Sequence, residues 1–287
     1  MSRRPSSDVR SILQKHFSTA DWHISKPKDG QQKACFVAQC DTEKVFIKLD
    51  VPVAALQRLG EIGVAPRVIT SGTIDGISHV VQEYITGSYP DWRWFADHLP
   101  TLAAFIKRYH TDQPLASLLA ANMQTSYVEH VAHDLARLER QYTTLHSEEL
   151  HAPTAVSAFE KLKAWSKQLQ AVPLVPVHPD PNTKNILLTN DSLLMVDWDD
   201  MQLSDPMRDV GLLLWWYVAP HHWNEFFETY GLTMDDGLIE RIHWWAARTS
   251  FAIALWHVEH RYDCRAFLVD FLAALNMGSN PHAVFEH

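Results

Sequence analysis

The order in which hydrophobic patterns follow one another is the feature of this sequence that most restricts its fold. Between residues 21 and 84, short β-branched and aromatic runs alternate with turn residues, as in antiparallel strands. From residue 99 onward, apolar residues recur at spacings of three and four, as on one face of a helix. A run of strands followed by a run of helices is typical of the α+β class. We therefore predict a small antiparallel β-rich lobe over residues 1–84 and a larger helical lobe over residues 85–287.

The predicted first lobe contains five strands, a leading helix and one inserted helix. Asp29-Gly30, Asp41-Thr42-Glu43 and Asp75-Gly76 supply turns between strands, and Gly63 with Pro66 ends the inserted helix. The strands are expected over residues 22–25, 34–38, 44–49, 68–71 and 79–84, and the helices over residues 8–20 and 53–62.

The predicted second lobe is mostly helical and includes a short β region. Helices are expected over residues 99–110, 127–146 and 156–169, the last two as an antiparallel pair. The β segments are expected over residues 175–177, 186–188 and 193–196. The C-terminal part is rich in aromatic residues, most of them expected in the core: Trp215, Trp216, Tyr217, Trp223, Phe226, Phe227, Trp244, Trp245, Phe251 and Trp256.

The composition is that of an ordinary soluble globular protein, with 46% hydrophobic and 21% charged residues. We expect no membrane span, because no run of eighteen apolar residues occurs, and no secretion signal follows Arg3 and Arg4. We interpret the chain as cytoplasmic. Cys35, Cys40 and Cys264 form no CxxC pair and are interpreted as buried or half-buried free thiols.

The charge is unevenly distributed along the chain. Residues 1–84 carry a net charge of +2, whereas the remainder carries −11. An acidic second part argues against nucleic acid or an anionic membrane as partner and suits a cationic small molecule. Solubility is the alternative explanation of the same charge.

The segment from His178 to Asp197 concentrates the polar residues that suit one kind of chemistry. Asp180 lies in a turn after a β segment, Asn185 begins the next strand, and Asp197 ends the strand after that. The hairpin between them folds back, so that the three side chains can converge. Carboxylate and amide oxygens are the ligands that Mg²⁺ prefers beside phosphate oxygens. A further carboxylate can accept the proton of an attacking hydroxyl, so the segment predicts phosphoryl transfer.

The same segment resembles a known family. His178-x-Asp180-x-x-x-x-Asn185 resembles the catalytic loop of the protein-kinase-like fold, as found in aminoglycoside phosphotransferases and choline kinases. Asp197 matches that family's second metal ligand, and Ser204-Asp205-Pro206-x-x-Asp209-Val-Gly211 resembles its GDPxxDL segment. The resemblance implies a two-lobed protein-kinase-like fold over nearly the whole chain. Pro179 departs from the family, which usually has Gly at that position.

The resemblance also implies a role for each residue of the motif. Asp180 would be the catalytic base that orients and deprotonates the acceptor hydroxyl. Asn185 and Asp197 would hold Mg²⁺ on the nucleotide phosphates. His178 and Asp209 are interpreted as residues that brace the catalytic loop.

The nucleotide is expected at the first lobe. Lys48 lies within a β-branched and aromatic strand, where an ammonium group is costly without an anionic partner. The resemblance assigns it to the α- and β-phosphates, and Lys44, at the exposed start of the strand, is the weaker competitor. Gly30 and Gln31 occupy the place of the family's nucleotide-covering turn, without the GxGxxG of protein kinases. Residues 82–85, which are Gln82, Glu83, Tyr84 and Ile85, match the hinge whose backbone binds the purine edge.

One element that the resemblance leads us to expect is missing. The helix over residues 53–62 should offer a Glu to the lysine, but residues 53–59 read Val-Ala-Ala-Leu-Gln-Arg-Leu. Gln57 is the only acceptor in that stretch, and Glu61 lies near the helix end. Either the helix is placed differently or Lys48 is held in another way. This gap is the main sequence argument for a catalytically impaired pseudokinase.

Several polar and aromatic features outside the motif receive structural interpretations. The paired histidines His257 and His260 lack an evident third metal ligand. Some of the tryptophans could wall an acceptor pocket, although most are expected in the core. Asp199 could touch metal or substrate but is interpreted as a solvated loop carboxylate. Six further acidic residues could recognise ammonium groups but are interpreted as surface charges: Glu225, Glu228, Asp235, Asp236, Glu259 and Asp263.

The sequence as a whole predicts a kinase that transfers the γ-phosphate of ATP or GTP, with Mg²⁺, to a hydroxyl of a small molecule. A cationic antibiotic, such as an aminoglycoside or a basic peptide, is the leading acceptor, which would make the protein an antibiotic-resistance enzyme. A metabolite kinase for choline, thiamine or an amino alcohol and a pseudokinase are the alternatives. A protein kinase is the weakest interpretation, because Asp197-Trp-Asp replaces Asp-Phe-Gly and no Ala-Pro-Glu segment follows.

Overall fold

The computed structural model divides into two compact units. It describes residues 5–17, 21–27, 34–120, 126–190 and 192–283. The first unit comprises residues 1–89 and 184–200, and the second comprises residues 90–183 and 201–287. Over the described residues, no helix combines the length and apolar character that crossing a lipid bilayer requires.

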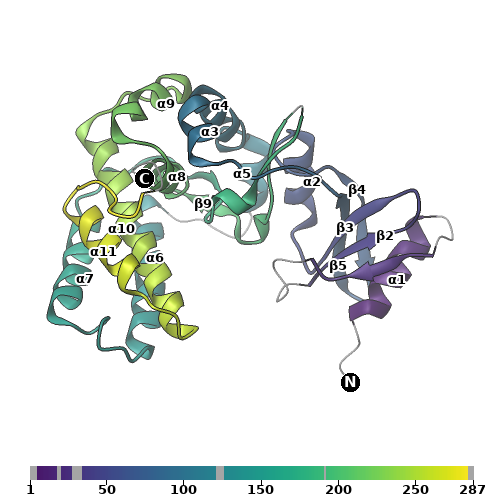
Figure 1. The fold of residues 1–287 in the computed structure, drawn as a ribbon, viewed down its shortest axis with the longest axis horizontal. Helices are drawn as coiled ribbons and strands as arrows, with labels where there is room; N and C mark the ends of the chain where they lie inside the picture. The colour runs from purple at the N-terminus through teal and green to yellow at the C-terminus, as the bar shows by residue number, and fades with distance from the viewer. Residues whose placement is uncertain (1–4, 18–20, 28–33, 121–125, 191, 284–287) are drawn as a thin grey trace. The chain divides into compact units, whose positions relative to one another are not determined.

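The first unit is built on a five-stranded antiparallel sheet, of which β2, β3, β4 and β5 are labelled in Figure 1. Its strand order is β1-β2-β3-β5-β4. The central strand β3 pairs with β2 on one side and with β5 on the other, so that Lys48 lies opposite Cys35 and Val80. Asp75 and Gly76 turn the chain between β4 and β5 with φ of 52° and 86°, which suits a tight hairpin. The strands are β1 (His23–Ser25), β2 (Cys35–Gln39), β3 (Lys44–Leu49), β4 (Val68–Ile74) and β5 (Ile77–Glu83).

Two helices complete the predicted strand pattern. The helix α1 (Pro5–His16) packs Val9, Ile12 and Leu13 into the same core as the sheet residues Phe36 and Ile47. The helix α2 (Val53–Glu61) follows β3 and turns Ala55, Leu56 and Leu59 inward. The predicted five-stranded lobe with one inserted helix is confirmed.

A short hairpin from later in the chain groups with the first unit. Its strands are β7 (Ile186–Leu188) and β8 (Leu193–Met195). Ser88 and Leu188 exchange backbone hydrogen bonds of 3.0 and 2.8 Å, and Met195 N donates to Val64 O at 2.8 Å. A Cβ at Gly87 would come within 2.6 Å of the Leu188 carbonyl oxygen, so glycine permits this close approach. The contacts therefore group residues 184–200 with residues 1–89, whereas the division into lobes at residue 85 stays a prediction.

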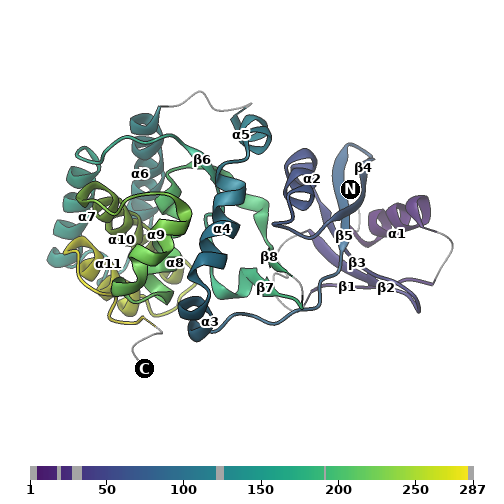
Figure 2. The ribbon, with the colours of Figure 1, turned by 90° about the horizontal axis from the view of Figure 1, so that it is seen from above.

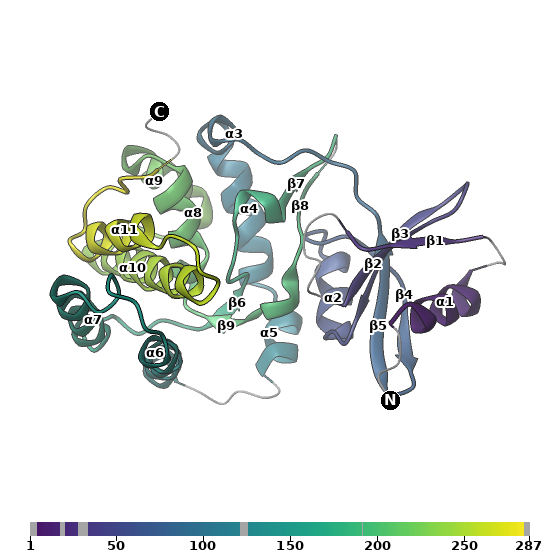
Figure 3. The ribbon, with the colours of Figure 1, turned by 60° about the horizontal axis from the view of Figure 1, so that its bottom comes forward.

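The second unit is helical and is centred on the long helix α10 (Asp236–Glu259). The helices α6, α7, α10 and α11 lie side by side (Figure 3), and α4 packs along α9 (Figure 2). A small sheet pairs β6 (Val175–Val177) with β9 (Gln202–Ser204). The remaining helices are α3 (Trp92–Asp97), α4 (Leu99–His110), α5 (Gln113–Ala120), α6 (Tyr127–Thr144), α7 (Pro153–Ser166), α8 (Val210–Tyr217), α9 (Trp223–Tyr230) and α11 (Arg265–Leu275).

Within the described residues, the helices α3 and α5 and the strand β9 were not predicted from the sequence. Local capping explains the first two, because Asp91 accepts from Trp94 N at 2.8 Å and Asp112 accepts from Leu115 N at 2.7 Å. The aromatic residues behave largely as predicted, since Trp215, Trp244 and Trp245 are buried, whereas Trp256 is 47% exposed. The three cysteines are free, as predicted.

Two histidines contact each other where α1 meets β4 and β5. The ring of His79 is fully buried, and neither of its nitrogens has a hydrogen-bond partner among the described residues. The His16 ring lies 5.7 Å away, and its Nδ1 is 2.9 Å from Thr70 Oγ1. Burial lowers the pKa of His79 below its ordinary 6.5, and His16 and Lys15 lower it further. His79 is therefore neutral in the folded protein near neutral pH.

This buried histidine predicts a loss of stability in acid. Below about pH 6.5 the unfolded chain binds a proton at His79 that the folded chain does not, so the free energy of unfolding falls as pH falls. The contribution of His79 to the free energy of unfolding changes by at most about 1.4 kcal/mol per pH unit. It stops changing below the lowered pKa of His79 in the folded protein. We expect His79→Leu to reduce the slope, measured by urea denaturation across this range. An unchanged slope in His79→Leu would contradict the neutral buried state.

Candidate active site

The segment that carries Asp180 is a loop stabilised by hydrogen bonds to buried residues. It follows β6, and its first residue, His178, is only 1% exposed. His178 Nδ1 accepts a hydrogen bond from Asp180 N at 3.3 Å, and Asn182 Nδ2 donates to Asp180 Oδ1 at 2.9 Å. These bonds restrain both the backbone and the carboxylate of Asp180, as an acid–base group in a reaction requires.

Asp209 braces this loop from the start of α8. It is fully buried and accepts hydrogen bonds from His178 N (3.1 Å), Tyr109 Oη (2.8 Å) and Val210 N (2.8 Å). His110 Nε2 lies 3.1 Å from the same carboxylate. One side chain thus joins the loop that carries Asp180 to α4 and α8, and the predicted bracing roles of His178 and Asp209 are confirmed.

The hairpin in the first unit brings Asn185 and Asp197 to one end of two paired strands. Val196 N donates to Asn185 O at 2.8 Å, which places the residue next to Asp197 beside Asn185. Asp197 has a φ of 65°, a backbone conformation that is costly for a residue other than glycine and is often found at functional sites. The next residue, Trp198, is 2% exposed and donates its Nε1–H to Met195 O at 2.8 Å, which closes the turn.

Lys48 faces the two carboxylates of this turn. It is 7% exposed and forms a hydrogen-bonded ion pair with Asp199, and its Nζ lies 3.8 Å from Asp197 Oδ1. The competing Lys44 is exposed and holds its ammonium 3.8 Å from the centre of the Tyr84 ring. Of the two lysines, Lys48 is therefore the one that lies beside the predicted metal ligands.

The helix α2 supplies no partner for Lys48. Gln57 Nε2 donates to Ser71 Oγ at 3.1 Å, and Glu61 accepts from Arg58 at 3.1 Å. The sequence interpretation of Asp199 as a solvated loop carboxylate is wrong, because its side chain is 23% exposed and pairs with Lys48. The partner of Lys48 is therefore Asp199, which follows β8, and not a residue of α2.

A pocket of about 410 Å³ lies within the first unit, beside the segment predicted to bind the purine. Its lining includes Glu83, Tyr84 and Ile85, together with Ala65 and Leu194. Gln82 instead is 4% exposed and donates its Nε2–H to Pro66 O at 3.0 Å, so its side chain has a structural role. Gly30 and Gln31 lie outside the described residues.

The side-chain oxygen atoms of this site fit Mg²⁺, the ion that the motif implies. Asn185, Asp197 and Asp199 offer amide and carboxylate oxygens, and a magnesium ion bound with phosphate needs only one or two protein carboxylates. Asp180 belongs to the second unit, whereas Lys48 and Asp197 belong to the first.

Comparison with known proteins agrees with this chemistry. The model of the Phosphotransferase enzyme family matches residues 48–244, a range that begins at Lys48 and includes Asp180, Asn185 and Asp197. The chain belongs to this family. It is therefore a phosphotransferase by family, as the sequence predicted.

Solved structures share the fold of this phosphotransferase over almost its whole length. Spectinomycin phosphotransferase APH(9)-Ia, in complex with ADP and spectinomycin, has 15% identity and a TM-score of 0.65, covering 98% of this chain and 96% of its own. Choline kinase LicA from Streptococcus pneumoniae has 16% identity and a TM-score of 0.66, covering 98% and 100%. A choline/ethanolamine kinase family protein from Mesorhizobium loti has 15% identity and a TM-score of 0.65, covering 99% and 100%. The predicted protein-kinase-like α+β fold is confirmed.

Sequence reasoning missed one polar cluster that supports the second unit. Asp134 is 4% exposed and accepts hydrogen bonds from the buried Arg208 and Arg248. A signal was present, because Asp134 occupies an apolar position of its helix, three residues after Val131 and four before Leu138. A carboxylate at such a position requires buried cationic partners.

Proposed function

We propose that this phosphotransferase transfers the γ-phosphate of ATP or GTP to a hydroxyl of a small molecule. The observation that carries the proposal is the ion pair of Lys48 with Asp199, beside Asp197. A buried lysine next to two carboxylates suits triphosphate binding, where cation and metal together neutralise the transferred charge.

Each residue has one part in the proposed reaction. Lys48 binds the α- and β-phosphates, and Asn185 and Asp197 would hold Mg²⁺, which neutralises phosphate charge when bound. Asp180 orients the acceptor hydroxyl and accepts its proton as the new oxygen–phosphorus bond forms. The carboxylate of Asp180 is restrained by Asn182, which supports a positioning role as well as a basic one.

The nucleotide base is proposed to occupy the 410 Å³ pocket against residues 83–85. The known structures of this fold that contain ADP or AMP are consistent with use of ATP. Gly30 and Gln31 are proposed to cover the phosphates.

The acceptor is proposed to be cationic, either an antibiotic or an amino-alcohol metabolite. The net charge of −11 over residues 85–287 supports this, since it attracts cations. The acidic candidates Asp235 and Asp263 are engaged locally, because Asp235 caps α10 at Leu238 N (2.7 Å) and Asp263 pairs with Arg265 (3.0 Å). The charge of the region as a whole, rather than these residues, supports a cation.

A panel assay tests the proposal. The protein is incubated with Mg·ATP or Mg·GTP and with aminoglycosides, basic peptides, choline, thiamine and amino alcohols, and ADP or GDP release is followed. Release that depends on one acceptor class supports a kinase for that class. Tight nucleotide binding without release for any acceptor would favour the pseudokinase instead.

Asp199 is proposed as the residue that positions Lys48, in place of the missing helix glutamate. Asp199→Asn removes the counter-charge, so we expect the KM for nucleotide to rise about tenfold with a smaller change in kcat, since a hydrogen bond to a charged group contributes roughly 1.5–3 kcal/mol. Asp200→Asn, at the exposed neighbouring position, is the matched control and should change neither constant. Equal nucleotide KM values for the two variants would contradict the role of Asp199.

A further inference from the structure

The helix α8 is hydrogen-bonded to both ends of the loop that carries Asp180. At the start of α8, Asp209 accepts from the backbone N–H of His178 at 3.1 Å. At its last residue, the hydroxyl of Tyr217 is hydrogen-bonded to the backbone N–H and to the side chain of Thr183. Asp180 lies between these two points of attachment, and all five residues belong to the second unit.

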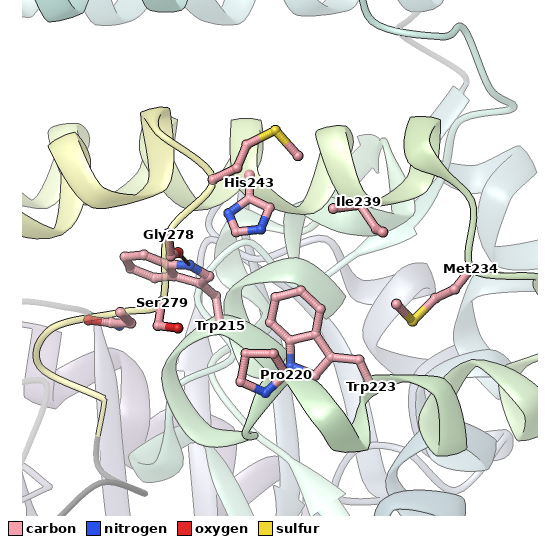
Figure 4. Close-up of a pocket in the computed structure, with 10 residues that line it drawn as sticks. Trp215, Pro220, Trp223, Met234, Ile239, His243, Gly278 and Ser279 are labelled. Carbon is pink, nitrogen blue, oxygen red and sulfur yellow. Dashed lines mark hydrogen bonds between the residues drawn. The ribbon is translucent and has the colours of Figure 1, made fainter.

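The dimensions of α8 suit this double attachment. Tyr217 follows Asp209 by eight positions, which in an α-helix corresponds to a rise of about 12 Å and to about 80° beyond two full turns. The two side chains therefore leave α8 on the same side. Trp215 lies about 200° from Tyr217 around the helix. It lines a pocket of about 230 Å³ on the other side, together with Trp223 and His243 (Figure 4).

The ring of Tyr217 is fixed independently of its hydroxyl group. It stacks on the ring of Phe95 in α3, with 5.0 Å between the ring centroids and 16° between the ring planes. Phe95 is fully buried, and residues 210–215 of α8 are buried as well. A group that positions a catalytic side chain needs such a rigid support. The hydroxyl of Tyr217 therefore offers Thr183 a fixed point of attachment.

The hydroxyl of Tyr217 is uncharged in the folded protein near neutral pH. Burial raises the pKa of Tyr217 above its ordinary 10, the hydrogen bonds to Thr183 lower it, and the charge of Asp180 raises it again. The influence of Asp180 also indicates that its carboxylate lies near this hydroxyl. A neutral phenol is a much weaker base than a carboxylate, so Tyr217 does not replace Asp180 as the proton acceptor.

The carboxylate of Asp180 is restrained from the same short segment. Asn182 Nδ2 donates to Asp180 Oδ1 at 2.9 Å, and Asn182 directly precedes Thr183 in the chain. A shift of Thr183 would therefore also move the amide that orients the carboxylate. Since a misplacement of about 1 Å can cost about a hundredfold in rate, the loss of this attachment should be visible in kcat.

We propose that Tyr217 is a positioning residue of the phosphotransfer reaction, which holds Thr183 and, through Asn182, the carboxylate of Asp180 in its reactive place. The proposal rests on the proposed function, in which Asp180 accepts the proton of the acceptor hydroxyl. In this role Tyr217 affects the reaction step and not the binding of the nucleotide, which is assigned to residues of the first unit.

The variant Tyr217→Phe tests this role, because it keeps the ring on Phe95 and removes the oxygen that bonds Thr183. We expect kcat to fall about tenfold, since one lost hydrogen bond corresponds to a factor of about 2–12 and two are lost here. The nucleotide KM should stay within about twofold of wild type. Steady-state kinetics with the acceptor found by the panel assay measure both constants. Counting nucleotide sites by equilibrium binding corrects kcat for any unfolded protein.

Tyr142→Phe is the matched control. Tyr142 is also a buried tyrosine of the second unit, its hydroxyl donates to Leu150 O at 3.2 Å, and its ring stacks on His151. The same chemical change at this position should leave kcat and the nucleotide KM at their wild-type values. A loss of kcat in Tyr142→Phe equal to that in Tyr217→Phe would show a general effect of stability and would overturn the proposal.

A double-mutant cycle shows whether Tyr217 acts through Asp180. If it does, Tyr217→Phe should lower kcat little further once Asp180→Asn has removed the base, because residues that act as a unit are not additive. Fully additive losses, or wild-type kcat in Tyr217→Phe, would overturn the positioning role. Wild-type turnover in Asp180→Asn would instead contradict the proposed function itself, so the two failures are distinguishable.

Discussion

Asp180→Asn should lower kcat by at least about a hundredfold, because a positioned general base contributes typically 10²–10⁴-fold. The substitution removes the basic carboxylate but keeps its shape and an oxygen that can accept from Asn182, so the loop should keep its bonds to His178. The nucleotide KM and the far-ultraviolet circular dichroism spectrum should therefore change little. Steady-state kinetics with the acceptor found by the panel assay measure both constants.

Asp97→Asn is the matched control for this variant, since Asp97 is an exposed residue at the end of α3. It should retain wild-type kcat. Turnover of Asp180→Asn within a few-fold of wild type would mean that Asp180 is not the base, and the assigned mechanism would be wrong.

Asp134→Ala should lower the free energy of unfolding by about 3–5 kcal/mol, the cost of removing one partner of a buried ion pair. Asp134 accepts from Arg248 at 2.5 and 3.0 Å and from Arg208 at 3.1 Å. Burial by itself would raise the pKa of Asp134, but the charges of Arg248 and Arg208 hold it well below its usual range. Without Asp134, two buried guanidinium groups lose their counter-charge. Urea denaturation followed by tryptophan fluorescence measures the loss.

The control for this prediction lies on the same helix. Glu139 forms a surface ion pair with Lys163 at 2.8 Å, and its side chain is 45% exposed. Glu139→Ala should therefore cost less than about 1 kcal/mol. A loss in Asp134→Ala no larger than that in Glu139→Ala would show that the buried cluster does not stabilise the second unit.

Elements with a strong local pattern could be predicted from the sequence at their observed bounds. The strand Lys44–Leu49 and the helix Leu99–His110 are examples, because their apolar periodicity and flanking turn residues are local properties. The strand β9 (Gln202–Ser204) could not be predicted, since three residues become a strand only by pairing with β6, more than twenty residues earlier. Asp134 escaped notice for the same reason, because Arg248 lies 114 residues away.

In the site, too, contacts between residues close in sequence could be predicted, whereas a contact between residues far apart could not. Asn185 and Asp197 belong to one hairpin, so their approach follows from the turn between them. The pairing of Lys48 with Asp199 joins residues 151 positions apart, and the sequence instead directed attention to a glutamate on α2. The helix α2 lacks the expected glutamate, but Asp199 supplies the negative charge beside Lys48 in its place.

The fate of the γ-phosphate shows directly whether the protein transfers it to the acceptor. The protein is incubated with ATP that carries a radioactive γ-phosphate and with the acceptor found in the panel, and the products are separated and counted. We expect one labelled phosphate on an acceptor hydroxyl for each ADP formed, and labelling at least about a hundredfold slower with Asp180→Asn. Label found only as free inorganic phosphate would show hydrolysis without transfer and would contradict the proposed function.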